Sequence, residues 1–418
     1  MYCGGCLRDN TLAAALLAAS HQVLLIPLYT PTRTDENNLS EKRIFLGGIN
    51  VYLQQHFSFF RRSPWLLDRV LDFPPLLKLA SRWGIRVDPG HLGSMTVSVL
   101  KGADGRQSKE VNKLVRFLKQ EAAPEIINLP NSMLLGLAPA LKSELRVPVC
   151  CTLQGEDLFL EGLAEPYRSE ALDLIRSHAG HVDGFIAVSE SCASHMARYL
   201  GIDRKRIHVV SLGINLEGYG LPVALAPQPF TIGYLARIAP EKGLHQLCEA
   251  YRRLRQDKGL PPSRIRVAGY LAPEYRPYFR QIRKNVASWD LSAEFRYHGE
   301  LNRRQKIAFL QELHVLSVPG PYDEPKGIFL LEAMANGVPV VQPRRGAFTE
   351  IIEKTGGGIL VKPEDPEALA DGILSLWKNP QRRVELGRHG YEGVREHFSA
   401  SRMAESAVAV YRALGAGS

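Results

Sequence analysis

The 418-residue chain has few cysteines, no long apolar run and no low-complexity tract, and each absence narrows what the protein can be. Six cysteines in a chain of this length are too few for a disulfide-rich scaffold. Its apolar runs fall short of the ~18–20 residues that a transmembrane helix needs. The first ten residues are polar and glycine-rich, unlike a secretory signal peptide. We therefore expect a cytoplasmic protein with reduced thiols, and peripheral contact with the inner membrane face stays open.

Metal and nucleic-acid sites have little support in the sequence. Cys3 and Cys6 form a lone Cys-x-x-Cys pair with no second pair at zinc spacing, so we expect no metal site. The net charge is +9, but arginine pairs such as 61–62 and 303–304 are scattered, without the interleaved aromatics typical of nucleic-acid binding. We expect no nucleic-acid partner. A solvated basic surface explains the charge, and attraction of a diphosphate ligand or an anionic membrane face is the alternative.

Apolar strand patterns alternate with helical patterns along both halves of the chain, whose length suits two domains of about 150–200 residues. The expected strands are 22–28, 126–129, 149–153, 184–188 and 207–210, then 231–235, 264–268, 294–297, 315–318, 338–341 and 358–361. Repeated β-α-β units predict an α/β fold with two doubly wound, Rossmann-like domains. The proline-rich segment 221–229 lacks periodicity and indicates a linker.

Two regions depart from this plan. Residues 31–110 are rich in aromatics and prolines, and the amphipathic stretch 65–71 suits contact with a membrane or an acceptor, although packing against the domain is the commoner fate. At the chain start, Gly4 and Gly5 indicate a glycine loop ahead of a helix expected over 11–19. Only three residues precede this loop. We therefore expect the amino-terminal sheet to lack its leading strand and the coding start to lie upstream.

The segment from Glu324 to Glu332 is the strongest indication of chemistry. It sets two carboxylates eight residues apart around a glycine, between an expected strand and a helix expected over 328–336. Parallel sheets bind ligands at the carboxyl ends of their strands, where Glu324 lies. Backbone N–H groups at the helix start form an anion site; they belong to Gly327, Ile328, Phe329 and Leu330. A phosphate flanked by two hydroxyl-binding carboxylates describes a sugar nucleotide, whereas most glutamates at such spacing lie on solvated helix faces.

Arg237 and Lys242 supply a second pair of candidate side chains. Arg237 follows the expected strand 231–235, and Lys242 lies at the start of a helix expected near residue 244. The two cations can converge on one point from both sides of the turn. A leaving nucleoside diphosphate gains negative charge as its bond to the sugar breaks, so cations there stabilise the transition state more than the ground state. Without the glutamates downstream, an arginine and a lysine five residues apart are more often a surface coincidence.

The string Glu-x-x-Gly-Ile-x-Leu-Leu-Glu-Ala-Met-Ala-x-Gly-Val-Pro-Val-Val, over 324–341, resembles the Glu-x7-Glu signature of retaining glycosyltransferases of the GT-B fold, family 4, also called group 1. Residues 236–243 resemble the Gly-Arg-x-x-x-x-Lys-Gly element of the same enzymes, with Ala236 in place of glycine. The resemblance implies two Rossmann-like domains facing a cleft and transfer with retention of configuration. It implies a nucleotide diphosphate sugar as co-substrate, with no metal and no other cofactor. Glu324 would contact the sugar hydroxyls and Glu332 the ribose.

The resemblance extends to the amino-terminal half. Gly4 and Gly5 resemble the family's glycine loop, whose backbone reaches the donor phosphates and the acceptor. Gln154 stands where many relatives have the histidine of His-Gly-x-Asp, so with Asp157 it implies a sugar or acceptor contact but no proton transfer near pH 7. The implied domains are 1–220 on the acceptor side, linker 221–229, a donor-nucleotide domain over 230–398, and a helix over 399–418 that returns to the first domain.

Several functions stay open at this point. The leading one moves a hexose from a nucleotide diphosphate sugar to a lipid, saccharide or polysaccharide-precursor acceptor. Starch- or glycogen-synthase-like α-glucan synthesis is the alternative within that class. A nucleotide-sugar epimerase on the same fold typically needs other carboxylates and a histidine. A non-catalytic relative that binds a partner is disfavoured by Arg237, Lys242, Glu324 and Glu332, and mildly favoured by Gln154.

Overall fold

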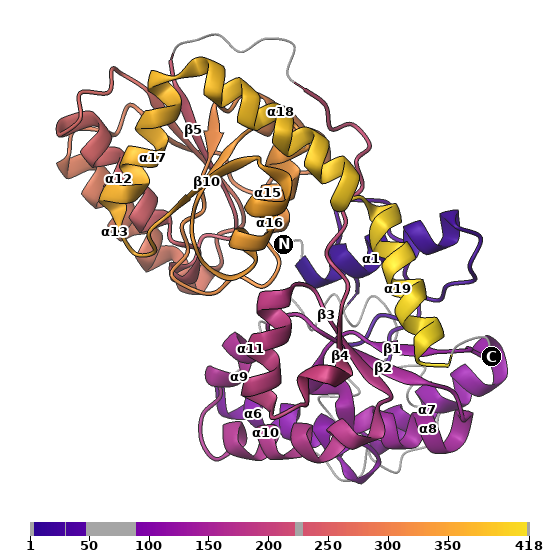
Figure 1. The fold of residues 1–418 in the computed structure, drawn as a ribbon. Coiled ribbons are helices and arrows are strands. Elements are labelled where there is room, and N and C mark those ends of the chain that lie inside the picture. Colours follow the sequence, from indigo (N-terminus) through magenta and orange to yellow (C-terminus); the bar gives the residue numbers. More distant parts are fainter. Residues whose placement is uncertain (1–3, 30, 47–88, 222–228, 416–418) are drawn as a thin grey trace. The chain divides into compact units, whose positions relative to one another are not determined.

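The computed structural model describes residues 4–29, 31–46, 89–221 and 229–415. The chain divides into two compact units (Figure 1). The N-terminal unit comprises residues 5–211 and 404–418, and the C-terminal unit comprises residues 1–4 and 212–403. The amphipathic stretch 65–71 and most of the expected linker, 222–228, lie outside the described residues.

The N-terminal unit is built on a parallel sheet in the order β1-β2-β3-β4. Its strands are β1 Ile127–Leu129, β2 Val149–Leu153, β3 Gly184–Ala187 and β4 Ile207–Val209. All five residues of β2 are buried, as is typical of a parallel strand covered on both faces. In Figure 1, α6, α7, α8 and α10 lie below this sheet, and α1 and α19 lie above it. On that upper side Asn128 of β1 donates to the Tyr411 hydroxyl of α19 at 3.0 Å.

Helices and 3₁₀ turns connect these strands. The helices are α1 Gly4–Ala18, α6 Pro89–Leu100, α7 Ser108–Phe117, α8 Ala138–Leu145, α9 Asp157–Glu161, α10 Tyr167–His178 and α11 Glu190–Leu200. Shorter turns are η1 Gly102–Asp104, η3 Ser132–Leu137, η4 Ala179–His181 and η5 Arg204–Arg206, and η2 Leu118–Ala122 is a π-helical turn.

Two predictions for the start of the chain were wrong. Gly4 and Gly5 are the first residues of α1 and not a loop, which a helix tolerates because its first four N–H groups need no partner within the helix. Segment 22–28 is not a strand of the sheet. Its described pairing consists of isolated bridges from Leu25 to Ser40 and from Leu28 to Phe45, so its backbone pairs with the residues that follow it. The missing leading strand stays a prediction.

The C-terminal unit has a six-stranded parallel sheet in the order β10-β9-β8-β5-β6-β7. Its strands are β5 Thr231–Leu235, β6 Arg264–Ala268, β7 Phe295–Tyr297, β8 Val315–Leu316, β9 Val340–Pro343 and β10 Gly358–Val361. The strand order reverses between β5 and β8. In a doubly wound sheet such a switch point is where ligands bind, beyond the carboxyl ends of the strands. The predicted fold class is confirmed.

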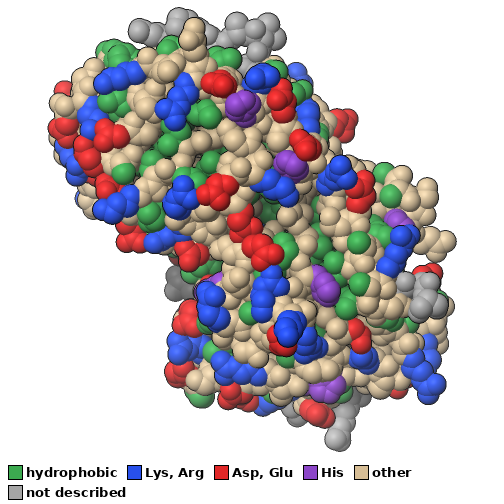
Figure 2. Space-filling view, viewed as in Figure 1, with side chains coloured by type: hydrophobic (Ala, Val, Ile, Leu, Met, Phe, Trp, Pro, Cys, Tyr) green, Lys and Arg blue, Asp and Glu red, His purple; other side chains and the backbone are tan. Residues whose placement is uncertain are grey.

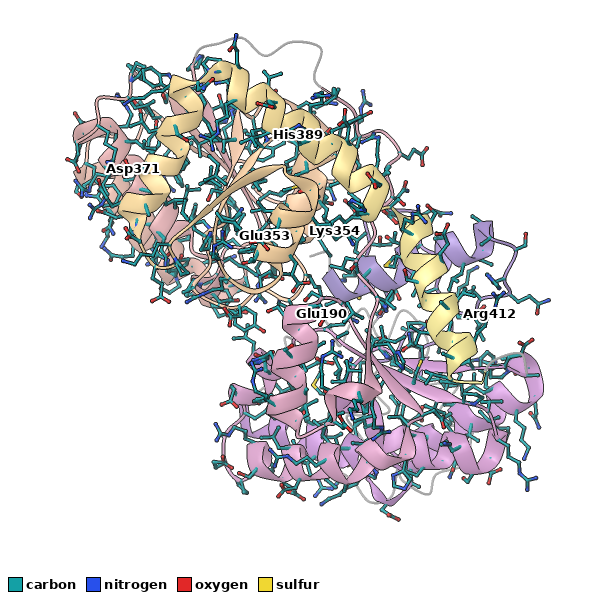
Figure 3. All side chains as sticks on the ribbon, viewed as in Figure 1. Glu190, Glu353, Lys354, Asp371, His389 and Arg412 are labelled. Atoms are coloured by element: carbon teal, nitrogen blue, oxygen red, sulfur yellow. The ribbon has the colours of Figure 1, made fainter. Side chains whose placement is uncertain are left out.

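Helices cover both faces of this sheet. They are α12 Leu244–Gln256, α13 Arg276–Ser288, α14 Arg303–Gln311, α15 Ile328–Met334, α16 Gly346–Thr355, α17 Pro366–Lys378 and α18 Pro380–His397, with turns η6 Pro240–Lys242 and η7 Pro273–Tyr275. The last helix, α19 Ala400–Ala413, belongs mostly to the N-terminal unit. In Figure 1, α12, α13 and α17 lie on one side of the sheet and α15 and α16 on the other. Asp371 of α17 pairs with Lys258 at 2.7 Å, beside the end of α12 (Figure 3).

The surface mixes charges of both signs. The visible face in Figure 2 intersperses Lys and Arg with Asp and Glu, which favours a solvated surface as the explanation of the net charge. Of the helices described in the structure, none is both long enough and apolar enough to span a bilayer.

Candidate active site

Two loops meet at the switch point of the C-terminal sheet, because glycine lets their backbones touch. One loop follows β5 and ends in η6, and the other follows β8 and leads to α15. Gly243 has φ +72°, and a Cβ there would lie 2.1 Å from the carbonyl oxygen of Pro319. A Cβ on Gly320 would lie 2.5 Å from the carbonyl oxygen of Glu241. With no side chains between them, the loops bring Lys242 to Glu324.

Lys242 and Glu324 form an ion pair between Nζ and Oε2. The lysine side chain is 19% exposed and the glutamate side chain 10%. Burial raises the pKa of Glu324, but attraction to Lys242 and its hydrogen bond outweigh this, with help from Lys326, so the pKa lies below its ordinary value. Glu324 is therefore a fixed, ionised carboxylate at neutral pH.

The start of α16 holds the Glu324 loop in place. The Ala347 N–H donates to the Glu324 carbonyl at 2.9 Å. Gly346 has φ +51°, and a Cβ there would lie 2.6 Å from the same carbonyl oxygen. Arg345 donates to the Pro321 carbonyl, and its Nε lies 3.2 Å from Asp323. Glu324 is thus positioned through its backbone as well as through its side chain.

Arg237 lies in the loop between the end of β5 and η6. The buried Tyr234 hydroxyl donates to the Arg237 carbonyl at 3.2 Å. The guanidinium pairs with Glu241 and lies 5.9 Å from the centre of the Tyr275 ring. The side chain is half-buried, so it can reach a ligand. Both predicted cations thus pair with a carboxylate. A bound phosphate would have to share each cation with that carboxylate or displace the carboxylate from it.

Glu332 lies in α15 and is 5% exposed. Its Oε1 accepts hydrogen bonds from Lys306 Nζ and from the Tyr219 hydroxyl, the latter at 3.2 Å. The Asn336 side chain donates to the Glu332 carbonyl at 2.9 Å. Because Glu324 and Glu332 are both buried and paired, the alternative of a solvated helix face is wrong.

One backbone N–H group at the start of α15 is already hydrogen-bonded within the helix. Gly327 caps the helix with φ +66°. The Leu330 N–H donates to the Gly327 carbonyl at 2.9 Å, which leaves the residues before it as the expected anion donors. Phe329 packs edge-on against Phe348 of α16, with ring centres 5.8 Å apart. The aromatic pair fixes the position of the helix start.

The predicted residues of the N-terminal unit lie at the carboxyl end of β2. Gln154 donates from Nε2 to the Pro130 carbonyl at 2.9 Å, and its backbone N–H donates to Glu156 Oε2 at 2.9 Å. The other carboxylate oxygen of Glu156 accepts from the Ser132 N–H at 3.0 Å. Glu156 therefore joins the ends of β1 and β2. Sequence reasoning missed this role, because nothing in the local pattern distinguishes Glu156 from a surface acid.

Asp157 is the first residue of α9, and its Oδ2 lies 3.0 Å from His195 Nε2 in α11. His195 is partly exposed, and its ring stacks on Tyr199 at 5.9 Å. The two residues of the pair lie 38 positions apart, so no sequence motif links them. In the part of the chain that the structure describes, no three His, Cys, Asp or Glu side chains gather as they would around a metal ion. Cys150, Cys151 and Cys248 are free thiols.

The architecture of two parallel-sheet units defines a GT-B protein, and comparison with known structures agrees. The structure of Anabaena HepE in complex with UDP matches with a TM-score of 0.64 and 17% identity, over 75% of this chain and 84% of that one. Residues 222–393 match the family model for glycosyl transferases group 1, and residues 105–217 match that for glycosyltransferase family 4. The chain belongs to the group 1 glycosyltransferases.

Curated relatives match part of the chain. The putative colanic acid biosynthesis glycosyltransferase WcaL of Escherichia coli is 28% identical over 56% of each chain. The MMP α-(1→4)-mannosyltransferase of Mycolicibacterium hassiacum is 26% identical over 56% of this chain and 54% of its own. The matched region thus spans about half the length of these relatives.

Proposed function

We propose that the protein is a retaining, metal-independent hexosyltransferase. It moves a hexose from a nucleoside diphosphate sugar to a lipid, saccharide or polysaccharide-precursor acceptor, without a further cofactor. The observation that carries the proposal is the Lys242–Glu324 pair at the switch point of the C-terminal sheet. A cation and a fixed carboxylate in contact suit a ligand whose diphosphate and sugar are joined at the bond that breaks.

The chemistry follows from these charges. The bond between the anomeric carbon and the diphosphate oxygen breaks, and its electron pair leaves with the diphosphate. Lys242 and Arg237 stabilise that charge, and Glu324 stabilises the positive charge on the sugar. The acceptor hydroxyl oxygen bonds to the anomeric carbon on the face that the diphosphate leaves, and its proton passes to the departing diphosphate oxygen. Because the pKa of Glu324 is lowered, this carboxylate acts as a charge and not as a general acid.

Binding roles are distributed over both units. In the C-terminal unit, Glu332 accepts from the ribose hydroxyls, and the N–H groups of Gly327, Ile328 and Phe329 face the phosphates. In the N-terminal half, Gly4 and Gly5 approach the donor through their backbone, and Gln154 and Asp157 contact the sugar or the acceptor. The UDP bound to HepE makes uridine nucleotides the first donors to test.

The test is a thermal-shift screen of the purified protein with UDP, GDP and ADP sugars, followed by transfer assays with each stabilising donor. A ligand that binds only the native state raises its melting temperature. Lys242→Met should lose the shift, whereas Lys362→Met, which removes an exposed cation of the same unit, should keep it. A shift that survives Lys242→Met would overturn the assignment of the diphosphate site. Binding without sugar transfer to any acceptor would leave a non-catalytic relative.

A further inference from the structure

A buried lysine faces the carboxylate assigned to ribose, although no motif in the sequence predicts it. Lys306 lies in α14 and is 7% exposed, and it pairs with Glu332, which is 5% exposed. Removing two charges from water costs several kcal/mol, which a buried pair recovers only through close contact and further hydrogen bonds. The Tyr219 hydroxyl supplies such a bond to the same carboxylate oxygen.

The hydrogen bonds to Glu332 leave one of its carboxylate oxygens able to accept from a ligand. Within the described residues, the hydrogen bonds found at this carboxylate reach Oε1. A carboxylate has acceptor positions on both of its oxygens, so Oε2 keeps capacity for hydroxyl donors. Side chains on a helix tilt toward its N-terminus, and Glu332 is four residues past Ile328, the first residue of α15. The carboxylate is thus directed toward the helix end where Glu324 lies.

Tyr219 is itself held from two sides. Arg303 lies over its ring at 5.0 Å, and the same guanidinium donates to the carbonyl of Glu217 at 2.8 Å. Arg395 of α18 donates to the Tyr219 carbonyl at 3.1 Å. A tyrosine fixed in this way presents its hydroxyl to Glu332 in one orientation.

We infer that Lys306 and Tyr219 are positioning residues that hold Glu332 turned toward a ribose hydroxyl, and so make the site select ribonucleotides over 2′-deoxyribonucleotides. Lys306 also balances the charge of Glu332 beside the phosphates of the ligand. The inference rests on the proposed function, because it takes Glu332 as the ribose contact. A purely structural tie between α14 and α15 would stabilise the fold without affecting this selection.

The experiment measures the dissociation constants of UDP and 2′-deoxy-UDP by calorimetry, and of GDP and 2′-deoxy-GDP if uridine nucleotides do not bind. The wild type should prefer the ribonucleotide by on the order of tenfold, as expected for one hydrogen bond to a charged group. Lys306→Met should bring this ratio close to one, and Lys306→Arg should restore part of it. Arg304→Met, which removes an exposed cation from the same helix, should leave the ratio unchanged.

Tyr219→Phe keeps the test decisive if Lys306→Met does not fold. It removes one hydroxyl and should lower the ratio by a few-fold. An unchanged ratio in Tyr219→Phe and in any folded Lys306 variant would overturn the inference, even if both variants were less stable. A wild type that binds no nucleoside diphosphate would instead overturn the proposed function.

Discussion

At the scale of single residues, the site depends on pairs of opposite charge. Lys242 pairs with the Glu324 carboxylate and, in the proposed function, also binds a phosphate of the ligand. The ion pair therefore changes when the ligand binds. Arg237 forms a similar pair with Glu241, the residue before Lys242 in η6. Such pairs balance the charges of the site and hold its side chains in place. A ligand that brings both a diphosphate and a sugar then exchanges one set of partners for another.

Variants of Glu324 and Glu332 should affect turnover and nucleotide binding differently. Glu324→Gln keeps the size of the side chain but removes the charge that faces the reacting sugar. We expect turnover to fall by about a hundredfold or more, by analogy with other preorganised electrostatic groups, and donor affinity to change less. Glu332→Gln should chiefly weaken nucleotide binding. Steady-state kinetics of both variants test this, and normal turnover in Glu324→Gln would show that its catalytic role is wrong.

The two cations should each contribute to diphosphate affinity. Replacing Arg237 or Lys242 by methionine should weaken nucleoside diphosphate binding by about 1–3 kcal/mol, as for other charge-assisted hydrogen bonds. Both variants should also be less stable, because Lys242→Met leaves Glu324 and Arg237→Met leaves Glu241 without its partner, and these carboxylate side chains are only 10% and 15% exposed. Calorimetry and urea unfolding measure the two effects. Unchanged affinity in both variants would remove the diphosphate site.

Glu324 should also make stability depend on pH. Its pKa is lower in the folded protein than in the unfolded chain, so the unfolded state binds the proton more tightly. The stabilisation is complete above the unfolded pKa of about 4.3 and is lost as pH falls through the lower folded pKa. The difference in unfolding free energy between the wild type and Glu324→Gln should therefore be constant near neutrality and shrink below about pH 4. Glu353→Gln is the control, since its exposed pair with Arg344 contributes little (Figure 3).

At the scale of elements, the contact between the β5 and β8 loops depends on Gly243. Alanine there would be strained at φ +72° and would meet the Pro319 carbonyl at 2.1 Å. Gly259 has a similar φ of +68° with nothing near its Cβ position, so Gly259→Ala carries the strain without the clash. The strain alone costs about 1–2 kcal/mol. We expect Gly243→Ala to be less stable than Gly259→Ala and to lose transfer activity. Equal unfolding midpoints would show that the loops are not tightly packed here.

The strands of the C-terminal sheet could be predicted from the sequence, and their ends show where prediction stops. β5, β6 and β10 have the expected bounds, because each is a short apolar run between turn residues. β8 ends early because the Val318 N–H donates to the Gln342 side chain at 3.3 Å instead of to a neighbouring strand. β9 starts late because Pro339 has no N–H and Val338 donates to Ala333. Side-chain bonds of this kind are not visible in an apolar pattern.

At the scale of the whole molecule, the glutamates and cations of the site were found because they lie in short motifs. Their partners were not, because Lys306 is 26 residues from Glu332 and Tyr219 is 113 residues from it. In the sequence, Lys306 lies among scattered basic residues, and such a pattern predicts side chains exposed to solvent. Only the folding of the sheet around its switch point brings such residues to one carboxylate. Sequence patterns thus predict the atoms that meet the ligand better than those that position them.

The assignment of roles to the two units predicts how a nucleotide protects the molecule from hydrogen exchange. The proposed phosphate and ribose contacts lie in the C-terminal unit, so UDP or the nucleotide that binds should slow exchange in residues 236–243 and 320–331. At a concentration of 100 times the dissociation constant, the bound state is favoured by ~2.7 kcal/mol, which bounds the protection. The strands β1 to β4 should exchange as before. Protection confined to the N-terminal unit would show that the nucleotide binds there and not at the Lys242–Glu324 pair of the C-terminal unit.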